Sequence, residues 1–141
     1  MILYVDTSAL VPLVVHEASS GACGELWDAA ERVTTTRLAY IEAAAAFALA
    51  QRLGRISPGD AEAARESLQE LWTVFDVVEI DEPLMASAAR LARTHALRGY
   101  DATHCAAAVA LNDDQVVAAT GDLRLLAAWR AEELAVRDTN R

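Results

Sequence analysis

The sequence predicts an α/β fold built on a parallel sheet, because short apolar or β-branched runs alternate with longer stretches of helical composition. The first run, residues 2–5, is continuously apolar, as expected for a parallel strand buried on both faces. Asp6 interrupts the apolar N-terminal region and no Lys or Arg precedes it, which argues against a signal peptide or a membrane span. We therefore expect a cytoplasmic protein.

The later elements follow the same alternation. Further strands are predicted at residues 32–36, 76–80, 115–119 and 134–137, the last at a sheet edge. Helices are predicted from Thr7 and Ser8 onward and at residues 38–53, 58–74, 83–96, 101–111 and 123–129. Gly54 is a good residue to follow a helix C-terminus, and Ser57 followed by Pro58 is typical of a helix start.

Length and composition limit the possible classes of protein. With 141 residues, 54% of them hydrophobic, and no linker or repeat, we expect residues 1–141 to form one domain. Cys23 and Cys105 form no metal-binding or redox motif, so buried free thiols are expected. The chain contains no Lys, which excludes Walker-A phosphate binding and Schiff-base chemistry.

Four acidic residues stand where a predicted strand ends or a helix begins: Asp6, Glu42, Asp101 and Asp122. A parallel sheet brings the carboxyl ends of its strands to one edge, so these carboxylates can converge there. Converging carboxylates repel one another and are stable together mainly around a hard divalent cation, and Mg²⁺ prefers oxygen ligands. The pattern predicts a metal-dependent enzyme.

Each acidic residue also has a simpler interpretation. Asp6 and Asp101 could cap the helices that follow them, and Asp122 could be a turn residue after Gly121. Glu42 is harder to explain in this way, because it lies in an Ala-rich stretch where an unpaired buried charge is costly. The joint occurrence of all four at strand–helix junctions favours a shared site.

Several neighbouring polar residues have two possible roles. Thr7, Ser8 and Thr120 could cap helices or orient the carboxylates and a metal-bound water. His104 follows Asp101 by one helical turn and so could face the site, but we favour a core or interface histidine.

Four motifs, in order, resemble those of a known family: DTSAL at 6–10, Glu42 followed by QRLGRI at 51–56, LRGYDATHCAAA at 97–108 and TGDLRL at 120–125. Together they resemble the PIN-domain ribonucleases, and within these the VapC toxins of type II toxin-antitoxin pairs. The resemblance implies an α/β/α sandwich with a central parallel sheet of about five strands. It also implies a Mg²⁺ or Mn²⁺ site made by the four carboxylates, with Thr120 in support.

The same resemblance implies a Mg²⁺-dependent endoribonuclease that is inhibited by a cognate antitoxin and forms a homodimer. In the Ala-rich stretch, Ile41, Phe47 and Leu49 are expected to face a partner helix. The candidates for contact with RNA phosphates lie near these motifs; they are Arg37, Arg98 and Arg124.

Other functions remain open from the sequence. A housekeeping PIN-domain nuclease would share the same site, and a non-catalytic metal- or RNA-binding module is a further alternative. An Asp-based phosphatase is disfavoured because Ser8 stands where its second Asp is needed, and a receiver domain needs a Lys that is absent.

The net charge of −9 leads to a testable expectation about RNA binding. A strongly acidic chain repels phosphates until a cation neutralises the carboxylates, so RNA should bind a cleavage-blocked variant weakly without Mg²⁺ and more tightly with it. Binding should be measured with and without Mg²⁺ over a range of salt. If the RNA affinity does not depend on Mg²⁺ and falls steeply as salt is added, an Arg-rich face binds the RNA instead.

Overall fold

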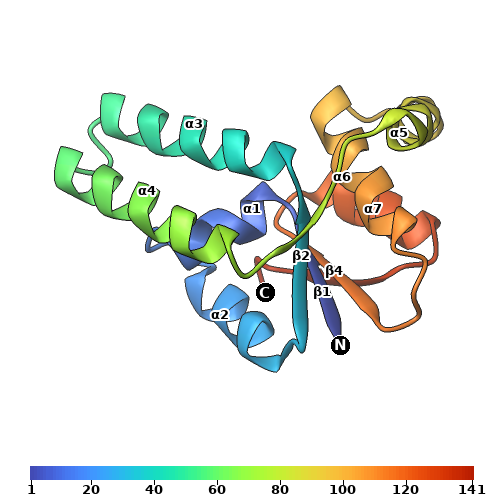
Figure 1. Ribbon diagram of the computed structural model, residues 1–141, viewed down its shortest axis with the longest axis horizontal. Helices are drawn as coiled ribbons and strands as arrows, with labels where there is room; N and C mark the ends of the chain where they lie inside the picture. The colour runs from blue at the N-terminus through green and yellow to red at the C-terminus, as the bar shows by residue number, and fades with distance from the viewer.

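The computed structural model describes residues 1–141 and contains a five-stranded sheet in the order β3-β2-β1-β4-β5 (Figure 1). The strands are β1 (Ile2–Val5), β2 (Arg32–Thr36), β3 (Asp76–Val78), β4 (Val116–Thr120) and β5 (Ala135–Asp138). All neighbouring strands run parallel. The predicted α/β class, with a central parallel sheet of about five strands, is confirmed.

Helices connect the strands and cover both faces of the sheet. They are α1 (Thr7–Leu10), the 3₁₀ turn η1 (Val11–Leu13), α2 (Ser20–Ala29), α3 (Leu38–Arg52), α4 (Pro58–Trp72), α5 (Glu82–His95), α6 (Gly99–Ala110) and α7 (Leu123–Ala131). Helix α2 was not predicted, because Gly21 and Gly24 lower its helix propensity and only Cys23 on it is fully buried.

Two predicted boundaries near the site are wrong. Helix α6 begins at Gly99 with Arg98 as its N-cap, so Asp101 lies inside the first turn and is not a helix cap. Strand β3 ends at Val78, two residues before the predicted end, because only residues 76–78 pair with β2.

Alternate side chains of the strands build a separate core on each face of the sheet. Leu3 and Val5 point into the core formed with α1, α2, α3 and α4. Tyr4 points the other way, into the core formed with α5, α6 and α7, where its ring meets Trp129 edge to face. Because successive side chains of β1 point to opposite faces of the sheet, this one strand contributes to both cores. Cys23 and Cys105 are buried free thiols, as expected.

Helices α3 and α4 form a hairpin that extends away from the sheet (Figure 1). Gly54 adopts a φ of 72°, and Ser57 and Asp60 form a capping box at the start of α4, which confirms the predicted turn. Phe47 points into the core and is 1% exposed, so its expected place on a partner surface is wrong, whereas Ile41 and Leu49 are exposed. No helix combines the length and the apolar character needed to cross a membrane.

The α3–α4 packing can be tested by truncating Leu68, which is 1% exposed. Leu68→Ala should lower the free energy of unfolding by about 2 to 5 kcal/mol because it leaves a cavity in the core. The matched control is Leu53→Ala, at a leucine that is 55% exposed, which should change it by less than about 1 kcal/mol. Chemical denaturation of both variants gives the comparison, and equal losses would contradict the assigned packing.

Candidate active site

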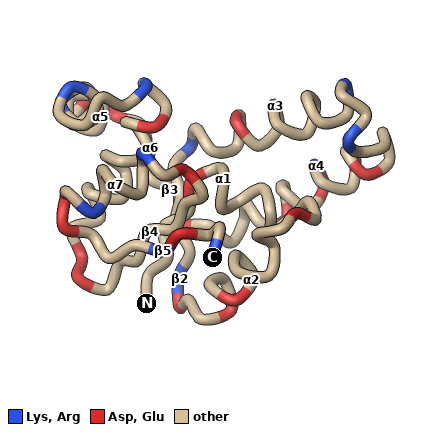
Figure 2. Tube along the Cα trace, turned by 180° about the vertical axis from the view of Figure 1, so that it is seen from behind, with Lys and Arg blue, Asp and Glu red and all other residues tan.

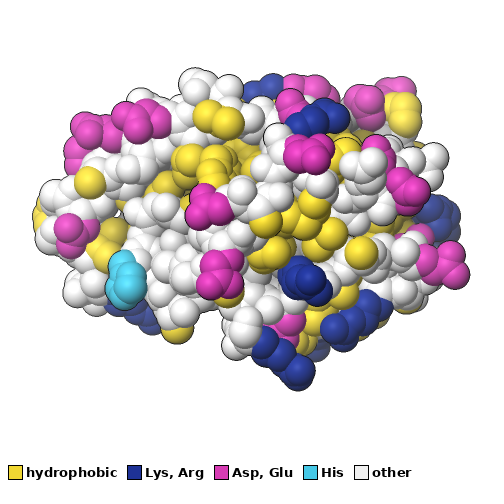
Figure 3. Space-filling view, turned by 90° about the horizontal axis from the view of Figure 1, so that it is seen from below, with side chains coloured by type: hydrophobic (Ala, Val, Ile, Leu, Met, Phe, Trp, Pro, Cys, Tyr) yellow, Lys and Arg dark blue, Asp and Glu magenta, His cyan; other side chains and the backbone are white.

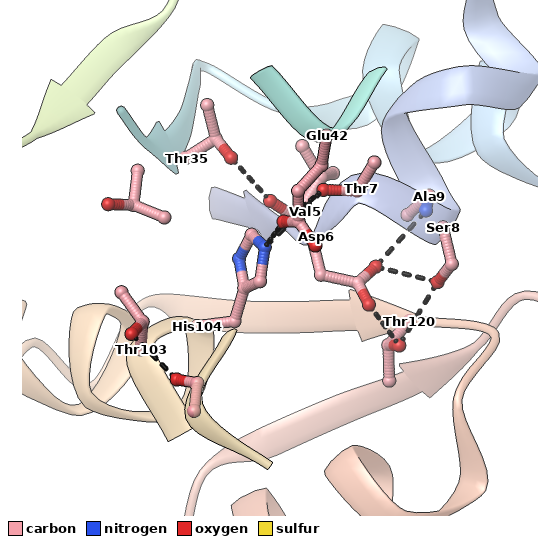
Figure 4. Close-up of polar contacts among 12 residues, drawn as sticks. Val5, Asp6, Thr7, Ser8, Ala9, Thr35, Glu42, Thr103, His104 and Thr120 are labelled. Atoms are coloured by element: carbon pink, nitrogen blue, oxygen red, sulfur yellow. Dashed lines mark hydrogen bonds and ion pairs between the residues drawn. The ribbon is translucent and has the colours of Figure 1, made fainter. Parts of the chain in front are cut away.

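Asp6 directly follows β1 and is only 5% exposed. Its Oδ1 accepts hydrogen bonds from the Ser8 hydroxyl at 2.7 Å and the Ala9 backbone N–H at 3.1 Å, and its Oδ2 accepts one from the Thr120 hydroxyl at 2.7 Å (Figure 4). Burial raises the pKa of Asp6, although the charge of His104 and these donors act in the opposite direction. Asp6 therefore caps α1 and also presents a buried carboxylate at the sheet edge.

Glu42 reaches the same edge of the sheet from α3, and its side chain is 24% exposed. Its Oε1 accepts a hydrogen bond from the Thr7 hydroxyl at 2.7 Å and lies 2.7 Å from His104 Nε2 (Figure 4). Burial acts to raise the pKa of Glu42, but the hydrogen bond and charge of His104 and the Thr7 hydroxyl outweigh it, so the pKa is lowered. Glu42 is thus held as a carboxylate.

Asp101 lies in the first turn of α6 and is 9% exposed. Arg98 donates from Nε to its Oδ2 at 3.3 Å. Burial, and after it the negative charge of Asp122, raises the pKa of Asp101 against the effect of Arg98. Asp122 caps α7, where its Oδ1 accepts from the backbone N–H groups of Arg124 and Leu125. The two carboxylates are near enough to repel each other.

The hydroxyls that were predicted to support the site link its parts. The Asp122 backbone N–H donates to Thr120 Oγ1 at 2.9 Å, so Thr120 joins Asp122 to Asp6. The Gly121 backbone N–H donates to Ser8 Oγ at 2.8 Å. A Cβ at Gly121 would lie 3.2 Å from Thr139 Oγ1 and 3.6 Å from Ser8 Oγ, so this close approach favours glycine. The Thr7 hydroxyl donates its hydrogen bond to Glu42 and not to the adjacent Asp6.

The oxygen donors suit a hard divalent cation such as Mg²⁺ or Mn²⁺. Glu42 Oε2, Asp101 Oδ1 and Asp122 Oδ2 take part in no hydrogen bond within the chain, and the buried carboxyls of Asp6 and Asp101 have raised pKa values that a bound cation would lower. No three Asp, Glu, His or Cys side chains stand close enough together to hold an ion as they are placed. The donor chemistry therefore fits, and the carboxylates would need to draw together around the ion.

The three candidate arginines differ in their surroundings. Arg37 is paired with Glu79, and Arg98 is paired with Asp101 and stacks on the Tyr100 ring at 4.8 Å. The guanidinium of Arg124 makes no ion pair within the chain and extends from an exposed position beside Asp122. In Figure 2 the basic residues occur singly along the trace, among acidic ones. The chain thus carries isolated arginines near the site in place of a broad basic face.

His104 is closer to the site than its sequence position alone indicated. Its ring is 2% exposed, as expected for a core histidine, but it also contacts Glu42 directly. Its other ring nitrogen, Nδ1, lies 2.8 Å from the Tyr4 hydroxyl. The one available signal was the spacing of His104 from Asp101, which places it one helical turn further into α6.

Fold and site together define a class of α/β protein with buried carboxylates at the carboxyl edge of a parallel sheet. The family model of the PIN domain matches residues 3–128. The ribonucleases VapC45 and VapC49 of Mycobacterium tuberculosis are each 37% identical to this chain over 124 residues, which cover 88% of the chain and 86% of each relative.

A solved structure agrees with these relatives. The crystal structure of VapC20 from Mycobacterium tuberculosis, a toxin that cleaves the sarcin-ricin loop, superposes with a TM-score of 0.68 at 25% identity, covering 89% of this chain and 94% of that one. The chain belongs to the PIN-domain family, and within it to the VapC ribonucleases.

The raised pKa of Asp101 gives a stability prediction with a definite sign. Because this pKa lies above its ordinary value of 3.8 in the folded chain, the folded state binds the proton more tightly, and stability is lost as the pH rises toward neutrality. Asp101→Asn should therefore raise the melting temperature at neutral pH in metal-free buffer and should raise it little at a pH well below 3.8. The control is Asp114→Asn, in an exposed loop. A lower melting temperature for Asp101→Asn at neutral pH would contradict this electrostatic reading.

Proposed function

We propose that this chain is a divalent-metal-dependent endoribonuclease and the toxin of a toxin-antitoxin pair. The observation that carries the proposal is the set Asp6, Glu42, Asp101 and Asp122 at one edge of the sheet, in a chain of the VapC family. The relatives VapC45 and VapC49 are named ribonucleases, and VapC20 is a toxin. A housekeeping PIN-domain nuclease is the alternative, and a small antitoxin gene directly upstream would favour the toxin.

In the proposed reaction the carboxylates act through a bound Mg²⁺ or Mn²⁺. Held by Asp6 and Asp101, with Glu42 and Asp122 directly or through water, the ion would supply positive charge at the scissile phosphate and activate a water for in-line attack. Ser8 and Thr120 hold the Asp6 carboxylate in place. On binding the ion, Asp101 would give up its contact with Arg98, and that guanidinium would then be free for a phosphate oxygen.

An apolar groove between α3 and α4 supports an antitoxin partner. It has a volume of about 400 Å³ and is lined by Arg37, Tyr40, Ile41, Gln69 and Trp72. Ile41 is 65% exposed. Seen from below in Figure 3, the molecule also exposes apolar side chains among both acidic and basic ones. An apolar antitoxin segment that carries basic residues would match this groove and the acidic surface near it. In this proposal an antitoxin Arg or Lys pairs with the four carboxylates and displaces the ion.

Metal dependence is tested by RNA cleavage with the purified chain. EDTA should abolish cleavage, and added Mg²⁺ or Mn²⁺ should restore it. Asp6→Asn, Asp101→Asn and Asp122→Asn should each lose activity while staying folded. The loss should exceed about 100-fold, the upper range for changing a group that only supports a metal ligand. Asp114→Asn should remain active. Full activity of Asp101→Asn in EDTA would overturn the proposed mechanism.

Assembly is tested by light scattering and, where a small protein is encoded directly upstream, by co-expression with that protein. The chain should be a homodimer and should form a tight complex with that protein. Ile41→Arg should weaken the complex, because it places a charge in the apolar groove. The control is Val74→Arg, at a residue that is 62% exposed outside the groove. A monomer at all concentrations would contradict the dimer, and an unaffected complex in Ile41→Arg would contradict the groove as the docking site.

A further inference from the structure

A chain of hydrogen-bonding contacts runs from the core of the protein to Glu42. The Tyr4 hydroxyl lies 2.8 Å from His104 Nδ1, and His104 Nε2 lies 2.7 Å from Glu42 Oε1. The Thr7 hydroxyl donates to the same Glu42 oxygen at 2.7 Å (Figure 4). Two side chains, Thr7 of α1 and His104 of α6, thus meet at one carboxylate oxygen of Glu42 in α3. Tyr4 of β1 contacts the other nitrogen of the His104 ring.

Exposure increases along this chain of contacts. Tyr4 is fully buried and His104 is 2% exposed, whereas the Glu42 side chain is 24% exposed. Only the Glu42 end can therefore meet an ion that arrives from solvent. The buried end is fixed by packing, since the Tyr4 ring lies edge to face against both His104 and Trp129.

The direction of the hydrogen bonds at Glu42 follows from the charge of its carboxylate. Glu42 is a carboxylate with a lowered pKa, so it can only accept, and His104 Nε2 must carry a proton to donate to it. Burial first, and then the charges of Asp6 and Glu42, keep the pKa of Tyr4 well above its usual value, so its hydroxyl retains its proton. The hydroxyl can donate to Nδ1 of a neutral His104 ring or accept from Nδ1–H of a charged one, so it holds the ring in either state. Both donors at Glu42, the Thr7 hydroxyl and His104 Nε2, then act on Oε1, and Oε2 receives none.

We propose that Tyr4, His104 and Thr7 are positioning residues that fix the Glu42 carboxylate with Oε2 free for the divalent cation. The inference rests on the proposed metal-dependent function, adds Tyr4 and His104 to it and assigns Thr7 to Glu42. Tyr4 acts on Glu42 only through His104, because no hydrogen bond joins Tyr4 and Glu42 directly. A carboxylate held in one rotamer binds an ion without first losing that rotational freedom, so the three residues raise metal affinity.

The test is calorimetric titration of the purified chain with Mn²⁺, combined with the melting temperature in metal-free buffer. Tyr4→Phe removes only the hydroxyl, and Thr7→Val removes only the second donor. Each should raise the Mn²⁺ dissociation constant by about 10-fold, the lower end of the range seen when a group supporting a metal ligand is lost. Thr34→Val is the matched control, because the Thr34 hydroxyl is also buried but has no partner, and it should leave the constant unchanged.

Variants of His104 separate positioning from packing. Gln can place an N–H near the position of Nε2, whereas Met fills similar volume with no donor. His104→Gln should therefore retain more Mn²⁺ affinity than His104→Met, even where both lower the melting temperature equally. Equal Mn²⁺ affinities for the two would show that His104 only fills space.

The outcomes distinguish this inference from the function on which it rests. If the unaltered chain binds Mn²⁺ and Tyr4→Phe and Thr7→Val bind it equally well, the positioning role is overturned and the metal-dependent function stands. If the unaltered chain binds no Mn²⁺, the proposed function fails and the inference fails with it. Weaker Mn²⁺ binding in both variants, with Thr34→Val unchanged, is the expected result.

Discussion

The burial of carboxylates at the end of a parallel sheet is the constraint on which the rest of this site depends. Asp6 is 5% exposed and Asp101 is 9% exposed, and an ionised group so far from water is costly unless donors surround it. The chain supplies the hydroxyls of Ser8 and Thr120 and the Arg98 guanidinium. These donors do not remove the whole cost, because the pKa values of Asp6 and Asp101 remain raised. A bound cation would reduce this remaining cost, because its positive charge stabilises the ionised carboxylates.

Glu42 differs from the two aspartates, because it contacts a side chain from the other layer of the protein, His104. Its helix, α3, packs on one face of the sheet, and His104 lies in α6 on the other face. The two side chains meet beyond the end of β1, where the sheet no longer separates them (Figure 4). The contact therefore helps to hold the layers in register while it lowers the pKa of Glu42. Changes in packing between the layers are expected to reach the site through this contact.

The position of the apolar groove relates binding of a partner to catalysis. Ile41 lines the groove and is the direct neighbour of Glu42 in α3, so a partner seated against Ile41 lies beside the site. Arg37, at the start of the same helix, also lines the groove and is paired with Glu79. In the proposed function, a partner with apolar and basic side chains would contact both the groove and the carboxylates, which would provide a physical basis for inhibition by occlusion.

The sequence by itself determined the order and approximate positions of the strands, and it singled out four carboxylates as candidates for the site. Apolar and β-branched runs mark the strands, and parallel topology sends residues that follow β1 and β4, such as Asp6 and Asp122, to one edge. Only the tertiary structure decided which donor serves which carboxylate. Thr7 reaches Glu42, 35 residues away, and not its neighbour Asp6, and His104 reaches Glu42 from another layer. The physical reason is that a hydrogen bond depends on side-chain direction between packed elements, and local sequence patterns do not encode that direction.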